Sequence, residues 1–180
     1  MSEILQLKID VMKTKPLIWR RVEIKETATF WDLHVVIRCS YEWTDEQPHY
    51  FKIVSKNNKE IIIRSYLDDY ENNKFPLSWN IGIKKYITDK RNKIYYIYGT
   101  NENHKHSITL EKKFYRKLKK KYPICTAGRG IVDESESEEE PLIGKQLRSI
   151  EKFKTDDVVL TEGFRALTEH KNKLFDQIYY

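Results

Sequence analysis

The chain has 180 residues, of which 39% are hydrophobic and 33% are charged, and its formal net charge is +6 at pH 7. This length fits one domain, alone or with an appendage, and the apolar share is sufficient to build a core. No apolar run approaches the roughly 20 residues that cross a bilayer, and two cysteines cannot form a disulfide framework. We therefore expect a soluble cytoplasmic protein without a membrane partner. A eukaryotic host would also allow a nuclear location.

The amino-terminal residues predict a long β-hairpin. In the segment "LQLKIDV", Leu5, Leu7, Ile9 and Val11 alternate with polar residues, which is typical of a half-buried strand. Pro16 interrupts this pattern, and "IWRRVEI" then resumes it. The simplest arrangement pairs the two strands with each other.

The next segment, "TATFWDLHVVIRCSYEW", changes to helical spacing. Thr29 with Asp32 three residues later has the form of a capping box. Leu33, Ile37 and Tyr41 then fall on one helical face. We expect an amphipathic helix that packs on the sheet.

Two further hairpins follow, and helices are expected near the carboxyl end. "HYFKIVS" and "EIIIRS" flank the turn "KNNK", and "NKIYYIYG" and "HSITLEK" flank the turn "TNEN". The predicted fold class is α+β, with an antiparallel sheet built from hairpins, one amphipathic helix packed on it, and C-terminal helices. We assign residues 1–132 to this α+β domain, residues 133–141 to an acidic linker, and residues 142–180 to a helical C-terminal extension.

Four segments, in this order, resemble a known family. They are "KPLIWRRVEI", "TFWDLHVVI" leading into "YEW" and "PHYFKI", "IYYIYG" followed by "HKHSITLEK", and "YPICTAGRG". Together they resemble the plasmid pRiA4b open-reading-frame-three-like family over roughly residues 4–132. The resemblance implies an α+β fold with antiparallel sheet and a family often carried on plasmids and insertion elements. It implies no established reaction.

Cys125 is the residue that most resembles a reactive group, and it allows three interpretations. A catalytic thiolate needs a nearby base or cation. A metal site could combine Cys125 with His104 and His106, which are two residues apart and would share one face of a strand. The small residues that follow Cys125 also suit a tight loop around a buried thiol. We favour the structural thiol, and we assign no catalytic residue and no cofactor.

Arg20 and Arg21 are adjacent on a predicted strand, so their side chains point to opposite faces. We favour a buried pair between one arginine and a carboxylate such as Asp32 or Glu42. Anion recognition is the alternative, because guanidinium geometry suits phosphate.

The segment "KKFYRKLKKKY" gives the strongest indication of function. Its basic residues alternate with rings, and cations on phosphates release counterions while rings stack on unpaired bases. Acidic residues 133–140 lie shortly downstream and could instead neutralise these cations. The predicted binding residues are Lys112, Lys113, Tyr115, Arg116, Lys117, Lys119, Lys120 and Lys121.

Three functions remain open at this point. The first is a non-enzymatic module that binds nucleic acid or a protein associated with nucleic acid, and the partner is then nucleic acid or an acidic protein. The second is a protein-interaction or inhibitor module of a mobile element or virus. The third is a metal- or cysteine-dependent enzyme. The basic segment favours the first.

Overall fold

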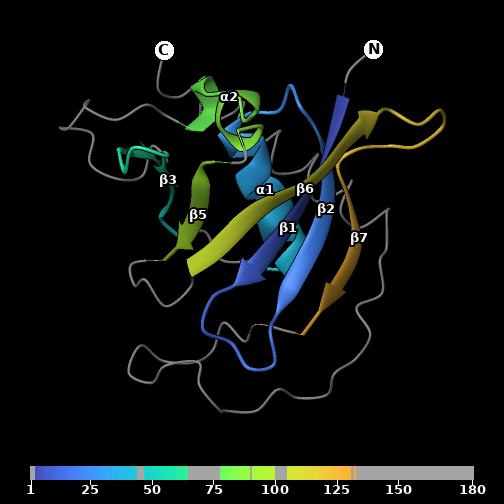
Figure 1. Ribbon diagram of the computed structural model, residues 1–180. Coiled ribbons are helices and arrows are strands. Elements are labelled where there is room, and N and C mark those ends of the chain that lie inside the picture. The colour runs from blue at the N-terminus through green and yellow to red at the C-terminus, as the bar shows by residue number, and fades with distance from the viewer. Residues whose placement is uncertain are drawn as a thin grey trace, which may run out of the picture.

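The computed structural model describes residues 3–43, 47–64, 78–89, 91–99, 105–130 and 132 (Figure 1). The elements follow one another in the order β1 (Glu3–Val11), β2 (Trp19–Lys25), α1 (Phe30–Tyr41), β3 (His49–Val54), β4 (Glu60–Arg64), η1 (Ser78–Asn80), α2 (Lys84–Ile87), β5 (Lys93–Tyr98), β6 (Lys105–Tyr115) and β7 (Ile124–Arg129). The predicted acidic linker and C-terminal helices lie outside these residues. No helix among them is long and apolar enough to cross a membrane.

The strands form one antiparallel sheet in the order β4-β3-β5-β6-β1-β2-β7. This confirms the three predicted hairpins, which are β1–β2, β3–β4 and β5–β6. β6 and β7 are consecutive in the chain but are separated by β1 and β2 in the sheet. The connection between them therefore passes the ends of two other strands. The result is an α+β fold dominated by its sheet.

Helix α1 begins as the sequence predicts. The Thr29 hydroxyl accepts from the backbone N–H of Asp32 at 3.2 Å, and the Asp32 carboxylate accepts from the backbone N–H of Thr29 at 2.8 Å. These two bonds satisfy donors that have no partner inside the helix. The helix ends at Glu42, whose φ is 61°. It lies across one face of the sheet, behind β1, β6 and β2 in Figure 1.

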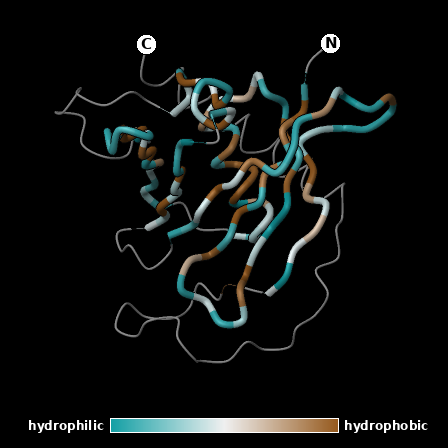
Figure 2. The backbone as a smooth tube through the Cα atoms, viewed as in Figure 1, coloured by the Kyte–Doolittle hydropathy of each residue, from teal (hydrophilic) through white to brown (hydrophobic). Residues whose placement is uncertain are grey.

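The core fills the space between α1 and the sheet. Alternation of hydropathy is visible along the strands in Figure 2, and it places one residue in two against the helix. Ile83 and Ile87 from α2 and its preceding turn join the same core. The fully buried core side chains include Leu5, Leu7, Ile9, Phe30, Leu33, Ile37, Phe51, Ile53 and Tyr96.

The opposite face of the sheet is polar, and we call it the open face. Paired residues in neighbouring strands share a face, so the register assigns the members. They include Gln6, Lys8, Asp10, Trp19, Arg21, Glu23, Tyr95, Lys105, Ser107, Thr109, Glu111, Lys112 and Arg129.

Candidate functional site

The predicted basic segment forms the end of β6 and the connection to β7, and we call residues 112–121 the basic loop. Figure 1 shows it as the gold extension that projects beyond the sheet. Tyr115 is 66% exposed and Leu118 is 96% exposed. The exposed cations of the loop are Lys112, Lys113, Arg116, Lys117, Lys119 and Lys121. Positive charge and apolar surface therefore reach solvent at the same place.

The loop is organised around the Phe114 ring. The Nζ atoms of Lys112 and Lys117 lie 5.6 Å and 5.9 Å from its centroid, within the range of cation–π attraction. The backbone turns at Lys119, whose φ is 65°, and the Lys120 N–H donates to the Lys117 carbonyl at 3.3 Å. The ammonium groups of Lys112 and Lys117 therefore lie beside the same Phe114 ring.

Lys120 differs from the other predicted binding residues because it is half-buried. Its Nζ lies 2.9 Å from Oε2 of Glu23, whose side chain is 8% exposed. The same Nζ lies 5.8 Å from the Tyr122 ring centroid. Lys120 therefore fastens the loop to the open face.

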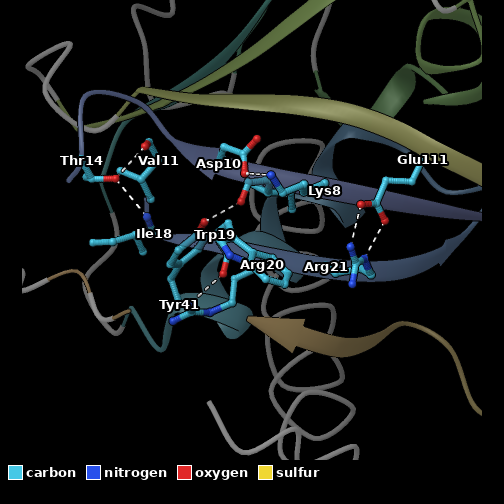
Figure 3. Close-up of polar contacts among 11 residues, drawn as sticks. Lys8, Asp10, Val11, Thr14, Ile18, Trp19, Arg20, Arg21, Tyr41 and Glu111 are labelled. Carbon is cyan, nitrogen blue, oxygen red and sulfur yellow. Dashed lines mark hydrogen bonds and ion pairs between the residues drawn. The ribbon is translucent and has the colours of Figure 1, made fainter. Parts of the chain in front are cut away.

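Arg21 pairs with Glu111 across the open face (Figure 3). Arg21 Nε and Nη2 donate to the two carboxylate oxygens at 2.6 Å and 2.8 Å, and Gln6 Nε2 donates to one of them at 2.6 Å. The bonds from Arg21 hold the pKa of Glu111 below its usual value. The sequence predicted a buried arginine–carboxylate pair. The observed pair is half-exposed, its acid is Glu111, and Asp32 caps α1 instead.

Glu111 reaches Arg21 because β6 contains a bulge. Gln6 pairs with Lys112 and Leu7 pairs with Leu110, which leaves Glu111 as an extra residue. A bulge redirects the side chains that follow it. The sequence carries no local signal for this irregularity.

Arg20 is 3% exposed and lies on the α1 side of the sheet. Its Nε donates to the Ser40 carbonyl at 2.6 Å, and its Nη1 donates to the carbonyls of Trp19 and Arg129 at 3.0 Å and 3.1 Å. Its guanidinium carbon lies 4.6 Å from the Tyr41 ring centroid. Burial lowers the pKa of Arg20. This arginine joins the end of α1 to β2 and β7.

Two distant motifs meet at Arg20. The sequence suggested a tight loop after Cys125, whereas residues 124–129 form strand β7 paired with β2. Gly128 lies opposite Arg20, and a Cβ there would be 2.8 Å from Arg20 Cδ. "WRR" and "CTAGRG" are thus two halves of one packing arrangement, in which the glycine makes room for the arginine.

Two of the three groups proposed for a metal site, His106 and Cys125, lie on different strands and do not converge. His106 is fully buried, and its ring centroid lies 5.3 Å from those of Tyr41 and Trp43. Cys125 lies on β7, three strands away, which corresponds to about 14 Å across the sheet. His104 lies outside the described residues. Within the described part of the chain, no group of three His, Cys, Asp or Glu side chains could hold a metal ion.

A buried histidine pair is the feature that sequence reasoning missed. The rings of His34 and His49 stack with centroids 3.5 Å apart and an interplanar angle of 4°, and His34 Nδ1 lies 2.8 Å from the Tyr96 hydroxyl. Burial lowers the pKa of both rings, that of His49 to about 3. Both imidazoles are therefore neutral near pH 7. The only indication in the sequence is that His49 occupies the same side of the alternating strand pattern as the apolar residue Phe51.

The described residues form an α+β fold in which one antiparallel sheet carries one helical layer, the buried Arg20 joins α1 to β7, and the basic loop projects beyond the sheet. The chain belongs to the plasmid pRiA4b ORF-3-like family, whose model matches residues 3–141. The crystal structure of a protein of unknown function from Methanosarcina mazei Go1 is similar, with 29% identity and a TM-score of 0.66. The match covers 75% of this chain and 74% of that one. No curated protein matches the chain.

Proposed function

We propose that this chain is a non-enzymatic binding module that holds nucleic acid, or a protein associated with nucleic acid, through the basic loop. The observation that carries the proposal is that six exposed cations lie on one projecting loop, two of them beside the Phe114 ring, together with the exposed Tyr115 ring. Lysine and arginine attract phosphates, and exposed rings offer stacking surfaces.

The charges near the loop support this proposal. Three carboxylates of the open face are already paired with cations, because Asp10 contacts Lys8, Glu111 contacts Arg21, and Glu23 contacts Lys120. In contrast, the exposed cations of the loop form no salt bridge with a described carboxylate. Among the described residues the loop therefore carries an excess of positive charge, and such a surface attracts a polyanion.

The positions of the candidate reactive groups also favour binding over catalysis. Cys125 is 5% exposed, and its thiol donates to the Ala127 carbonyl at 3.5 Å. His106 lies on a different strand, β6, and aromatic rings enclose it. A nucleophile needs access to its substrate, and both side chains are buried. The packing of these two residues supports structural roles.

The test is salt-dependent binding of labelled DNA and RNA to the full chain. The triple variant Lys113→Gln, Lys117→Gln, Lys121→Gln removes three exposed charges from the loop. For duplex DNA, the slope of log K against log salt should fall by about 2.7, since each phosphate contact contributes about 0.9. The matched control, Lys56→Gln, Lys59→Gln, Lys85→Gln, removes three exposed charges elsewhere.

Equal binding by the loop variant and the control variant would refute the assignment to the basic loop.

The exposure of Leu118 supports the alternative, a protein associated with nucleic acid, because a 96% exposed leucine suits an apolar contact with a protein partner. A partner that resists nuclease treatment and is lost on Leu118→Ser would favour that alternative.

A further inference from the structure

One cross-strand row of the open face carries two aromatic rings. The register pairs Tyr95 with Ser107, Ser107 with Asp10, and Asp10 with Trp19. The two rings therefore lie in one line perpendicular to the strands and three strands apart, which is about 14 Å. Arg129 continues the row on β7 as the partner of Trp19.

Cations accompany both rings. Lys105 Nζ lies 4.8 Å from the Tyr95 centroid. Lys8 Nζ and the Arg21 guanidinium carbon lie 5.6 Å and 5.2 Å from the Trp19 centroid. Each half-buried ring thus has positive charge within cation–π distance.

Within the row Arg129 balances Asp10, and Lys8, Lys93 and Lys105 beside the row add positive charge. Asp10 is the acid in the row, and Lys8 contacts it at 2.8 Å, as Figure 3 shows. Lys93, Lys105 and Arg129 form no salt bridge with a described carboxylate. These three cations remain available for an anionic ligand that reaches the row.

A cavity lies beside the first ring. Its volume is about 370 Å³, and it opens where β5 begins next to β6. Apolar lining comes from isoleucines and Leu110, and polar lining comes from Asp89, Asn92, Lys93, Tyr95, Ser107 and Thr109. Asp89, the acid among them, is paired with Arg91 at 2.8 Å. A space of this size with mixed lining fits the range of small-ligand pockets.

We propose that this row, which we call the ring row, is a platform for single-stranded nucleic acid. Bases stack on Tyr95 and Trp19, and phosphates contact Lys93, Lys105 and Arg129, while the cavity beside Tyr95 accepts a base. A duplex keeps its base faces stacked inside the helix, so it cannot use the rings. This inference rests on the proposed function, because it names the form of nucleic acid that the module prefers.

The experiment measures fluorescence anisotropy of a labelled oligo-dT strand and of a duplex of the same length, with the full chain. Tyr95→Ala and Trp19→Ala should each weaken binding of the single strand by about 5- to 150-fold. Binding of the duplex should change by less than about twofold, because the rings do not contact phosphates. Trp19→Phe keeps a stacking ring and should restore most of the affinity.

Tyr86→Ala is the matched control. It removes a half-buried tyrosine that also has a lysine near its ring, with Lys85 Nζ at 5.2 Å. That ring packs against Phe30 on the α1 side, with centroids 6.0 Å apart, so the single strand should bind this variant normally. Circular dichroism and the urea midpoint report whether each variant folds. If Trp19→Ala fails to fold, the ring row is tested by the loss of single-strand affinity in Tyr95→Ala, with Trp19→Phe as the folded variant at the second ring.

The outcomes separate the two proposals. If the triple loop variant loses affinity for both nucleic acids while the ring variants bind the single strand normally, the ring row is refuted and the basic loop stands. Equal affinity of the wild-type chain for strand and duplex would also refute the ring row. If the wild-type chain binds neither nucleic acid at low salt, both proposals fail.

Discussion

Replacing Gly128 with alanine should destabilise the protein even though the backbone at this position is compatible with any residue. A Cβ there would lie 2.8 Å from Arg20 Cδ, 3.2 Å from Arg20 Nη1 and 3.1 Å from the Trp19 carbonyl. Ordinary carbon contacts are about 3.5 to 4.0 Å. Arg20 must therefore move away from its position.

The cost follows from what holds Arg20 in place. The guanidinium donates to the carbonyls of Ser40, Trp19 and Arg129, and a buried charge that loses one of these bonds is costly. Overpacking costs about 1 to 3 kcal/mol, and one hydrogen bond of a charged group contributes about 1.5 to 3 kcal/mol. We expect Gly128→Ala to lower the free energy of unfolding by about 2 to 4 kcal/mol.

Urea unfolding followed by tryptophan fluorescence measures this loss. With a slope of about 2 kcal/mol per M, the midpoint should fall by about 1 to 2 M. Gly82→Ala is the control, because its Cβ would meet only the Ala28 carbonyl at 4.0 Å. That substitution should leave the midpoint unchanged or raise it slightly, since alanine reduces the entropy of the unfolded chain.

A double-mutant cycle tests the cause. Arg20→Met removes the guanidinium, so Gly128→Ala should cost less in that background, with a coupling energy of at least about 1 kcal/mol. If the two substitutions are additive, the clash with Arg20 is not the reason for the loss. A Gly128→Ala midpoint equal to that of Gly82→Ala would refute the packing argument altogether.

Three further predictions concern single side chains. His49 has a pKa of about 3 in the folded chain and about 6.5 in the unfolded chain, so the unfolded state binds more protons between these values and stability falls as pH decreases. Lowering the pH from 7 to 5 should therefore cost about 2 kcal/mol from His49, and a His49→Leu variant with the same pH slope as wild type would contradict this. Glu111→Gln should lower the free energy of unfolding by about 1 kcal/mol, measured by urea, because the pair with Arg21 is partly exposed and screened; 1 M salt should reduce the difference. Burial raises the pKa of Cys39 to about 11, so iodoacetamide at pH 7.5 should alkylate it about 100-fold more slowly than free cysteine, measured by mass spectrometry; a rate equal to that of free cysteine would refute this.

Local patterns were sufficient to predict most of the secondary structure. The alternation in "LQLKIDV" and "HYFKIVS" reports burial on one face, and the period of two belongs to the strand itself. Thr29 and Asp32 predicted the start of α1 because a capping box needs only residues three apart. The same period placed Arg20 and Arg21 on opposite faces, as the structure has them.

The basic loop was found for a similar reason, since a run of lysines with rings is visible in one short segment. Its projection beyond the sheet was not visible, because it depends on β1 and β2 lying between β6 and β7. Strand β7 itself was missed. Thr126, Ala127 and Gly128 have the composition of a turn, but they form a strand by pairing with β2, where Gly128 leaves room for the Arg20 side chain.

Covalent neighbours thus specified strands β1 to β6, the hairpins, the helix start and the cationic character of residues 112–121. Long-range packing selected Glu111 as the partner of Arg21, stacked His34 on His49, and aligned Tyr95 with Trp19. Each of these contacts depends on the register of several strands or on the placement of α1 over the sheet. The register of each strand is set by the burial of the whole core. That burial is a sum over many residues, which no single segment of the sequence contains.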